Sequence, residues 1–136
     1  DKMKYDVTRR LLDYLERKYE MRYNTALGCT EIRKANSVFR VGDAKKIRKN
    51  FKSLNLEDSA GLLFGYVAKE GKNRWFVLVN AGMKSAEINV GVFLDNGVIL
   101  IDNETADNGG ITEPKGVKIS GKSVTLDPLT ATVIRL

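Results

Sequence analysis

Residues 75–80 read Trp75-Phe76-Val77-Leu78-Val79-Asn80, a run in which five apolar side chains follow one another. Because successive residues of a β-strand point to opposite faces of a sheet, such a strand would be apolar on both faces. Residues 62–68 form a second run of the same kind. Strands of this type lie in the middle of a sheet and are covered on both sides. The two runs therefore predict the centre of a sheet, and one of its faces can meet a neighbouring domain.

Short apolar runs separated by turn residues continue from residue 51 to residue 136. We expect strands at residues 51–54, 62–68, 75–80, 86–90, 98–102, 117–120, 123–126 and 131–136. The breaks carry pairs such as Asn96-Gly97, Gly109-Gly110 and Gly121-Lys122, in which glycine allows the chain to reverse. This spacing predicts a mainly β fold, an antiparallel β-sandwich of about eight strands preceded by N-terminal α-helices.

The start of the chain has the periodicity of an amphipathic helix. Val7, Leu11, Leu15 and Tyr19 lie four apart within residues 6–22 and predict an apolar stripe. This stripe would stay exposed unless it packs on the sandwich or on a second copy of the chain. The four residues are therefore the candidate face for self-association or for docking within the molecule.

A second helix is expected to reach residue 35. Asn24 and Thr25 can cap its start, and three apolar residues, Leu27, Ile32 and Ala35, would face inward. The expected helices together make residues 1–41 a helical segment that precedes the sandwich of residues 42–136.

Three further residues carry local expectations. Gly28 would permit close packing of the second helix. Cys29, the single cysteine, is expected to be a small buried apolar residue. Asp43 would cap a short basic helix at residues 44–50.

The net charge of +6 is unevenly divided. Residues 1–52 carry 15 Lys/Arg against 7 Asp/Glu, whereas residues 53–136 carry 8 against 10. A basic half makes nucleic acid a candidate partner. Within residues 40–52, the side chains that could contact a nucleic acid are Lys45, Lys46, Arg48, Lys49, Lys52 and the aromatic Phe51. A solvated helix face explains this stretch more simply, so nucleic acid is the lesser alternative.

Composition removes several classes of chemistry. Histidine, the commonest general base and metal ligand at neutral pH, is absent. No apolar run reaches the roughly 20 residues of a membrane span, so we expect no membrane partner. Residues 1–5 show no signal-peptide pattern, and the compartment stays open.

Five carboxylates are candidates for the acid and base of a glycosidase. They are Glu57 with Asp58, Asp102 with Glu104, and Asp107. All fall in predicted loops or strand ends without an aromatic wall, so we expect solvated loop carboxylates. Residues 102–107 also suggest a calcium loop, but Asp107 stands where an EF-hand needs glycine. The sequence therefore predicts no catalytic residue, no metal ligand and no cofactor.

Trp75 and Tyr66 are the candidates for a sugar-stacking platform. Such a platform would require both rings to face outward. Both residues lie inside runs with strand character, which favours packing in the core. Binding of α-glucan stays open as an alternative.

Three short motifs occur in the order found in one enzyme family. Residues 31–40, Glu31-Ile32-Arg33-Lys34-Ala35-Asn36-Ser37-Val38-Phe39-Arg40, resemble the signature at the end of the catalytic barrel in pullulanase-type enzymes of the α-amylase family. Residues 75–81 resemble that family's strand ending in Asn-Ala, and residues 124–134 resemble its closing strand. Asn36-Ser37 replaces the usual His-Pro, and residues 1–25 match poorly.

The resemblance implies that residues 1–41 hold the last helix of the barrel and that residues 42–136 are the C-terminal β-sandwich. In the family the catalytic carboxylates lie upstream on the barrel, so none can be assigned to this chain. The implied function is a non-catalytic accessory domain, and a full-length relative would hydrolyse α-1,6 branches of glucans. The implied partner is the catalytic barrel of a parent enzyme, and an α-glucan-binding module is the alternative.

Overall fold

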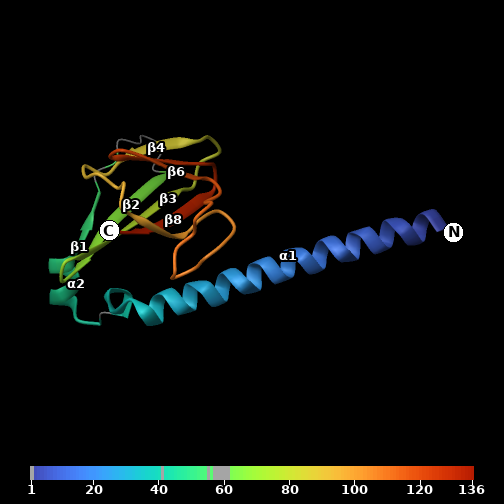
Figure 1. The fold of residues 1–136 in the computed structure, drawn as a ribbon, viewed down its shortest axis with the longest axis horizontal. Coiled ribbons are helices and arrows are strands. Elements are labelled where there is room, and N and C mark those ends of the chain that lie inside the picture. Colours follow the sequence, from blue (N-terminus) through green and yellow to red (C-terminus); the bar gives the residue numbers. More distant parts are fainter. Residues whose placement is uncertain (1, 41, 55, 57–61) are drawn as a thin grey trace.

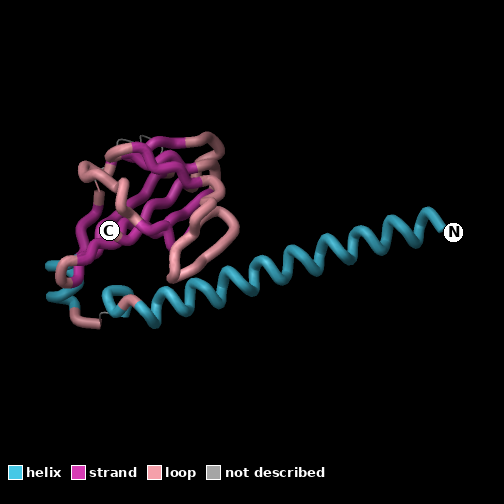
Figure 2. The backbone as a smooth tube through the Cα atoms, in the orientation of Figure 1, coloured by secondary structure: helices cyan, strands magenta, loops and turns pink. Residues whose placement is uncertain are grey.

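The computed structural model describes residues 2–40, 42–54, 56 and 62–136; in the first helix, the side chains of residues 3–6, 11, 14, 15 and 18–23 are outside the described set. A long helix, α1, leads through a short helix, α2, into a β-sandwich (Figure 1). The first half of α1 runs away from the sandwich, and its second half lies beside it. Figure 2 shows the change from a helical N-terminal part to strands and loops.

Helix α1 is continuous over Lys2–Ala35, 34 residues, and is about 51 Å long at 1.5 Å per residue. The expectation of two helices is therefore wrong. Neither glycine nor proline interrupts residues 22–26, so helix formation continues through the predicted cap. The hydroxyl of Thr25 instead donates a hydrogen bond to the Glu104 carbonyl oxygen at 2.8 Å. Among the described residues, no helix combines the length and the apolar character needed to cross a membrane.

After α1 the chain forms a 3-10 turn, η1 (Ser37–Arg40), and then α2 (Ala44–Asn50). The predicted N-cap of α2 is confirmed, because the Asp43 carboxylate accepts a hydrogen bond from the Lys45 backbone N–H at 2.8 Å. Arg40 folds back onto the end of α1, where its guanidinium donates to the carbonyl oxygens of Arg33 and Lys34. A basic side chain thus satisfies carbonyl groups that a helix end leaves unpaired.

The eight predicted strands are present. One sheet has the order β1 (Phe51–Ser53), β2 (Leu63–Glu70), β3 (Asn73–Asn80), β8 (Thr130–Arg135) and β5 (Val98–Ile101), and the other has the order β4 (Ala86–Asn89), β7 (Ser123–Leu126) and β6 (Val117–Ser120). The paired strands are antiparallel throughout. The predicted antiparallel β-sandwich is confirmed.

The main core fills the space between the two sheets. Phe76 and Leu78 of β3 and Ile134 of β8 face this core and meet Val124 and Leu126 of β7. The side chains at the other positions of β3 point to the opposite face of the five-stranded sheet, because successive side chains of a strand point to alternate faces. We call this opposite face the outer face.

Candidate functional site

The outer face of the five-stranded sheet is only partly covered. The strand register places its side chains in rows across β2, β3 and β8. The rows are Ala68 with Trp75, Tyr66 with Val77 and Val133, and Phe64 with Val79 and Ala131. The first row is buried. In the second row Val133 is buried and Tyr66 and Val77 are partly buried, and in the third row Phe64 is 55% exposed. Burial therefore decreases row by row along the sheet.

The end of α1 and the η1 turn cover the first row. Ile32 and Val38 are buried in one apolar cluster with Ala68, Trp75 and Val133. Phe39 packs edge-on against Trp75, with 6.2 Å between the ring centroids. These contacts make the end of α1 part of the same packed unit as the sandwich.

We call the contact between the end of α1 and the sandwich the joint, and Asn36 provides most of its hydrogen bonds. Its side-chain amide donates to the Ile32 carbonyl oxygen at 2.7 Å and to the Asn108 side-chain oxygen at 2.8 Å. Its own side-chain oxygen accepts the Trp75 indole N–H at 3.2 Å. Arg135 donates to the side-chain oxygen and to the carbonyl oxygen of Asn108. Hydrogen bonds therefore join four side chains, one each from the end of α1, β3, β8 and one loop: Asn36, Trp75, Arg135 and Asn108.

The loop at residues 102–115 packs against the same side of α1, the side that carries Thr25, Gly28 and Ile32. Gly28 lies so close to it that an added Cβ would be 1.9 Å from the Ala106 carbonyl oxygen. The predicted close packing at Gly28 is confirmed. Thr25 adds its hydrogen bond to Glu104, which lies two residues before Ala106. The helix thus meets the loop by backbone contact that only glycine permits.

Asp102 holds this loop in shape. The carboxylate is buried and accepts three backbone N–H groups, from Glu104 at 2.8 Å, Thr105 at 2.7 Å and Lys115 at 2.8 Å. The expectation of a solvated carboxylate is wrong for Asp102, because two N–H groups of the turn that follows it and the N–H of Lys115, at the far end of the loop, point toward its oxygens. A carboxylate engaged in this way is a structural group rather than an acid or base.

Of the other candidate carboxylates, the two that the structure describes, Glu104 and Asp107, have separate partners. Asp107 is exposed and accepts a hydrogen bond from the Gly109 backbone N–H, and Glu104 forms an ion pair with Lys115 at 3.3 Å. Glu57 and Asp58 lie outside the described residues. Within the described part of the chain, no group of three or more His, Cys, Asp or Glu side chains could hold a metal ion.

The two predicted sugar-stacking residues have different surroundings. Trp75 is 4% exposed and lies against the end of α1, so neither ring face is free for a sugar. Tyr66 is partly buried beside Phe51 and Phe64, with centroid distances of 5.7 and 6.0 Å. Partial burial raises the pKa of the Tyr66 hydroxyl. A shallow hollow of ≈ 230 Å³ lies next to this ring, lined also by Lys52 and Ser53.

The predicted association stripe lies on the first half of α1. Val7 is 61% exposed. The side chains of Leu11, Leu15 and Tyr19 lie outside the described residues, so the stripe stays a prediction. Docking of this half onto the sandwich is not observed, because the helix projects away from it (Figure 1).

Three side chains near the end of α1 differ from expectation. Cys29, Leu27 and Ala35 are exposed, and the prediction that they face inward is wrong. Ile32 is buried as predicted. The sandwich touches only the narrow side of the helix that carries Gly28 and Ile32, so neighbouring positions face solvent. Partial desolvation still raises the pKa of the Cys29 thiol.

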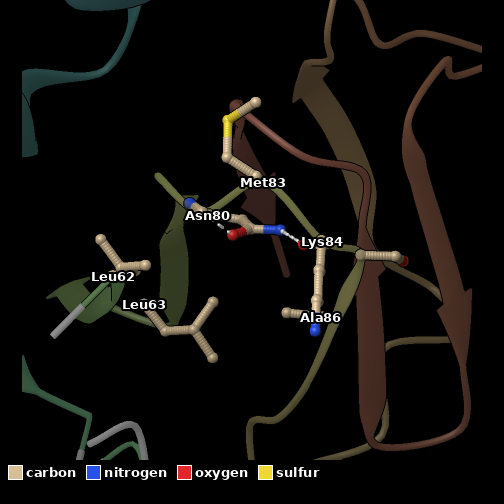
Figure 3. A pocket seen from close by; sticks show the side chains of 8 residues that line it. Leu62, Leu63, Asn80, Met83, Lys84 and Ala86 are labelled. Carbon is tan, nitrogen blue, oxygen red and sulfur yellow. Dashed lines mark hydrogen bonds between the residues drawn. The ribbon is translucent and has the colours of Figure 1, made fainter. Parts of the chain in front are cut away.

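A second hollow, of ≈ 350 Å³, opens at the end of β3 (Figure 3). Leu62, Leu63 and Met83 line it together with Asn80. The Asn80 amide accepts the Gly82 backbone N–H at 3.0 Å and donates to three carbonyl oxygens, of Lys84, Leu126 and Asp127. These bonds pin the β3–β4 turn to the β7–β8 turn. The hydrogen-bonding groups of the Asn80 amide are therefore used within the protein, and the rest of the hollow is mostly apolar.

The basic helix α2 is exposed along its length, as expected for a solvated face. Sequence reasoning missed the joint residues Asn108 and Arg135 entirely. Their only signal in the sequence is chemical type, because an amide and a guanidinium that become partly buried need hydrogen-bond partners, and these lie far along the chain.

Comparisons with known proteins identify relatives. The family described as SpuA C-terminal matches residues 52–136. Pullulanase A of Streptococcus pneumoniae is 29% identical over 118 residues, which cover 80% of this chain and 9% of the relative. The chain thus spans about a tenth of that relative's length.

Two solved structures share the fold at a similar level of identity. Pneumococcal SpuA, described as a multi-modular glycogen-degrading virulence factor, has a TM-score of 0.74 and 28% identity over 83% of this chain and 12% of that chain. The pullulanase SAP of group B Streptococcus, solved in complex with maltotetraose, has a TM-score of 0.73 and 25% identity over 83% of this chain and 16% of that chain. The chain therefore belongs to the SpuA C-terminal family of pullulanase-type glycoside hydrolases.

Proposed function

We propose that this chain is a non-catalytic accessory part of a pullulanase-type enzyme, which holds the last helix of the catalytic barrel in place. The joint around Asn36 carries the proposal. There the end of α1, which resembles that last helix, is fixed to the sandwich by apolar packing and by side-chain hydrogen bonds from β3 and one loop. A helix that is anchored at one end cannot shift relative to the sandwich without breaking these contacts.

The relatives support a role within a larger enzyme. A solved catalytic module of SpuA contains the similar region as 17% of its chain. The described carboxylates of this chain offer no acid and base pair, since Asp102 is engaged by backbone groups. The division into a helical part, residues 1–41, and a sandwich, residues 42–136, belongs to this proposal.

A graft tests the proposal. The similar region of the SpuA catalytic module is replaced by residues 24–136 of this chain, and a module that lacks the region altogether is the control. We expect the graft to unfold cooperatively and to hydrolyse pullulan, and the deleted module to lose both properties. The isolated chain should release no reducing sugar from pullulan. A graft that behaves like the deleted module, or hydrolysis by the isolated chain, would contradict the proposal.

A further inference from the structure

The positive charge of the chain is concentrated in two short stretches. Residues 31–52 and 69–74 together carry 11 Lys/Arg against 3 Asp/Glu, a net charge of +8. The remaining residues carry 12 Lys/Arg against 14 Asp/Glu, a net charge of −2. We define the basic end as the eleven Lys and Arg side chains of these two stretches.

The fold brings the two stretches together. Strand β1 begins directly after α2, and its first residue, Phe51, pairs with Ala68 near the end of β2. The β2–β3 turn therefore lies beside α2, and the Ser37 hydroxyl of η1 donates a hydrogen bond to the Glu70 carboxylate next to that turn. Helix α2 and the end of α1 lie at one end of the sandwich, whereas the first half of α1 extends the other way (Figure 1). The cations thus form one surface that α1 leaves open.

The cations of the basic end are accessible to an anionic partner. Ten of the eleven are exposed, and Arg74 is partly buried. Within the described part of the chain, the ion pairs are Arg9 with Asp13 and Glu104 with Lys115, so neither pair involves the basic end. Like charges that gather on one surface repel one another, and a partner with many negative charges relieves this repulsion.

Helix α2 indicates the kind of anion. Four of its seven residues are Lys or Arg, and Ile47, in the middle of them, is 38% exposed. This combination suits a lipid surface, where cations meet phosphate head groups and an apolar side chain enters between them. A single-stranded nucleic acid would instead gain from exposed aromatic rings, but Phe39 and Phe51 are partly buried against Trp75 and Tyr66.

We infer that the basic end binds the surface of an anionic lipid bilayer, with Ile47 inserted among the head groups. The expectation of no membrane partner rests on the lack of a membrane-spanning segment, which binding at the surface does not require. The inference goes beyond the proposed accessory role and does not depend on it.

The charge contribution is tested with vesicles and two matched triple variants. The partition of the full chain is measured by cosedimentation with vesicles of phosphatidylcholine and phosphatidylglycerol in equal amounts. One variant combines Lys45→Gln, Lys46→Gln and Lys49→Gln. The control combines Lys84→Gln, Lys118→Gln and Lys122→Gln, which removes the same charge from exposed lysines outside the basic end.

We expect the basic-end variant to bind about 100-fold more weakly than the wild type, because each cation near an anionic surface contributes about a factor of five. The control variant should bind less than about 5-fold more weakly, since its lysines lie away from the contact and are screened by salt. Vesicles of phosphatidylcholine alone should not bind the chain. Equal losses in the two variants, or no binding of the wild type to the anionic vesicles, would overturn the inference.

Insertion is tested by fluorescence quenching with lipids that carry bromine on their acyl chains. Ile47→Trp places a tryptophan in α2, and the wild type is the control, because its single tryptophan, Trp75, is only 4% exposed. We expect brominated vesicles to quench the variant and to leave the bound wild type unchanged. A bound variant that is not quenched would contradict insertion. Release of the chain from vesicles by duplex DNA at an equal phosphate concentration would overturn the inference in favour of nucleic acid.

Discussion

At the scale of single residues, Asn36 shows how a buried amide joins distant parts of a chain. The sequence predicted of Asn36 only that a helix would end just before it, at residue 35, and this end is confirmed, since α1 ends at Ala35. Its partners Trp75 and Asn108 lie 39 and 72 positions away. No local pattern indicates such partners, so the joint could not be predicted. The burial of Trp75 was favoured by its strand position, but the reason for its polar contact was not visible.

Removing this amide should loosen the joint. Asn36→Ala leaves the Trp75 indole N–H without a partner and removes one of the two hydrogen bonds to the Asn108 side-chain oxygen. We expect a loss of about 2–3 kcal/mol in the free energy of unfolding. Urea unfolding followed by fluorescence measures it, because Trp75 is the single tryptophan. Asn89→Ala is the control, since Asn89 is exposed and accepts one hydrogen bond from the Gly91 N–H. Equal losses in the two variants would contradict the assigned role of Asn36.

At the scale of elements, the strands were more predictable than the helices. The strands at residues 117–120 and 123–126 match their predicted bounds, because the turn between them contains Gly121, whose φ of 59° suits glycine. The two predicted helices are one, because Asn24 and Thr25 are weak stop signals and the tertiary contact of Thr25 with the 102–115 loop uses its hydroxyl. Cap residues indicate where a helix can begin, but packing decides whether it does.

The contact between α1 and the loop can be tested at Gly28. Gly28→Ala gains about 1 kcal/mol of helix propensity, but the added methyl would lie 1.9 Å from the Ala106 carbonyl oxygen. Because backbone must move to relieve this clash, we expect a net loss of about 1–3 kcal/mol in thermal unfolding. Gly42→Ala is the matched control, since no heavy atom lies within 4 Å of its added Cβ, and its stability should be unchanged or slightly raised. A stabilised Gly28→Ala would show that helix and loop are not in contact.

At the scale of the whole molecule, the sequence predicted the sandwich and the family correctly. Apolar residues on both faces of residues 75–80 indicated cover on both sides, and the inner face has it. The outer face has cover only near the end of α1. The part of the outer face that stays uncovered depends on where α1, which is distant in sequence, packs on the sheet. This part could therefore not be predicted without the three-dimensional structure.

The first half of α1 gives a prediction about the isolated chain. We expect self-association through the stripe of Val7, Leu11, Leu15 and Tyr19, because a projecting helix with an apolar stripe gains from burying it. Analytical ultracentrifugation should give a mass above the 15.2 kDa of one chain. Leu11→Asp and Leu15→Asp should return the chain to the monomer mass while Trp75 fluorescence stays unchanged. A monomeric wild-type chain would rule this association out.

The packing of α1 against the sandwich also decides where the part of the chain that can be exchanged between enzymes begins. The family match begins at residue 52, yet the side chains that shield Trp75 lie at Ile32, Asn36 and Val38. The border of the family match and the border of the packed unit therefore differ. A recombination event that replaced the sequence before residue 42 would remove the residues that cover Trp75. The tryptophan would then be exposed, and its indole N–H would lose the Asn36 acceptor. Crossovers before Thr25 would transmit the complete folding unit, so exchange of this domain between enzymes should favour breakpoints inside the long helix.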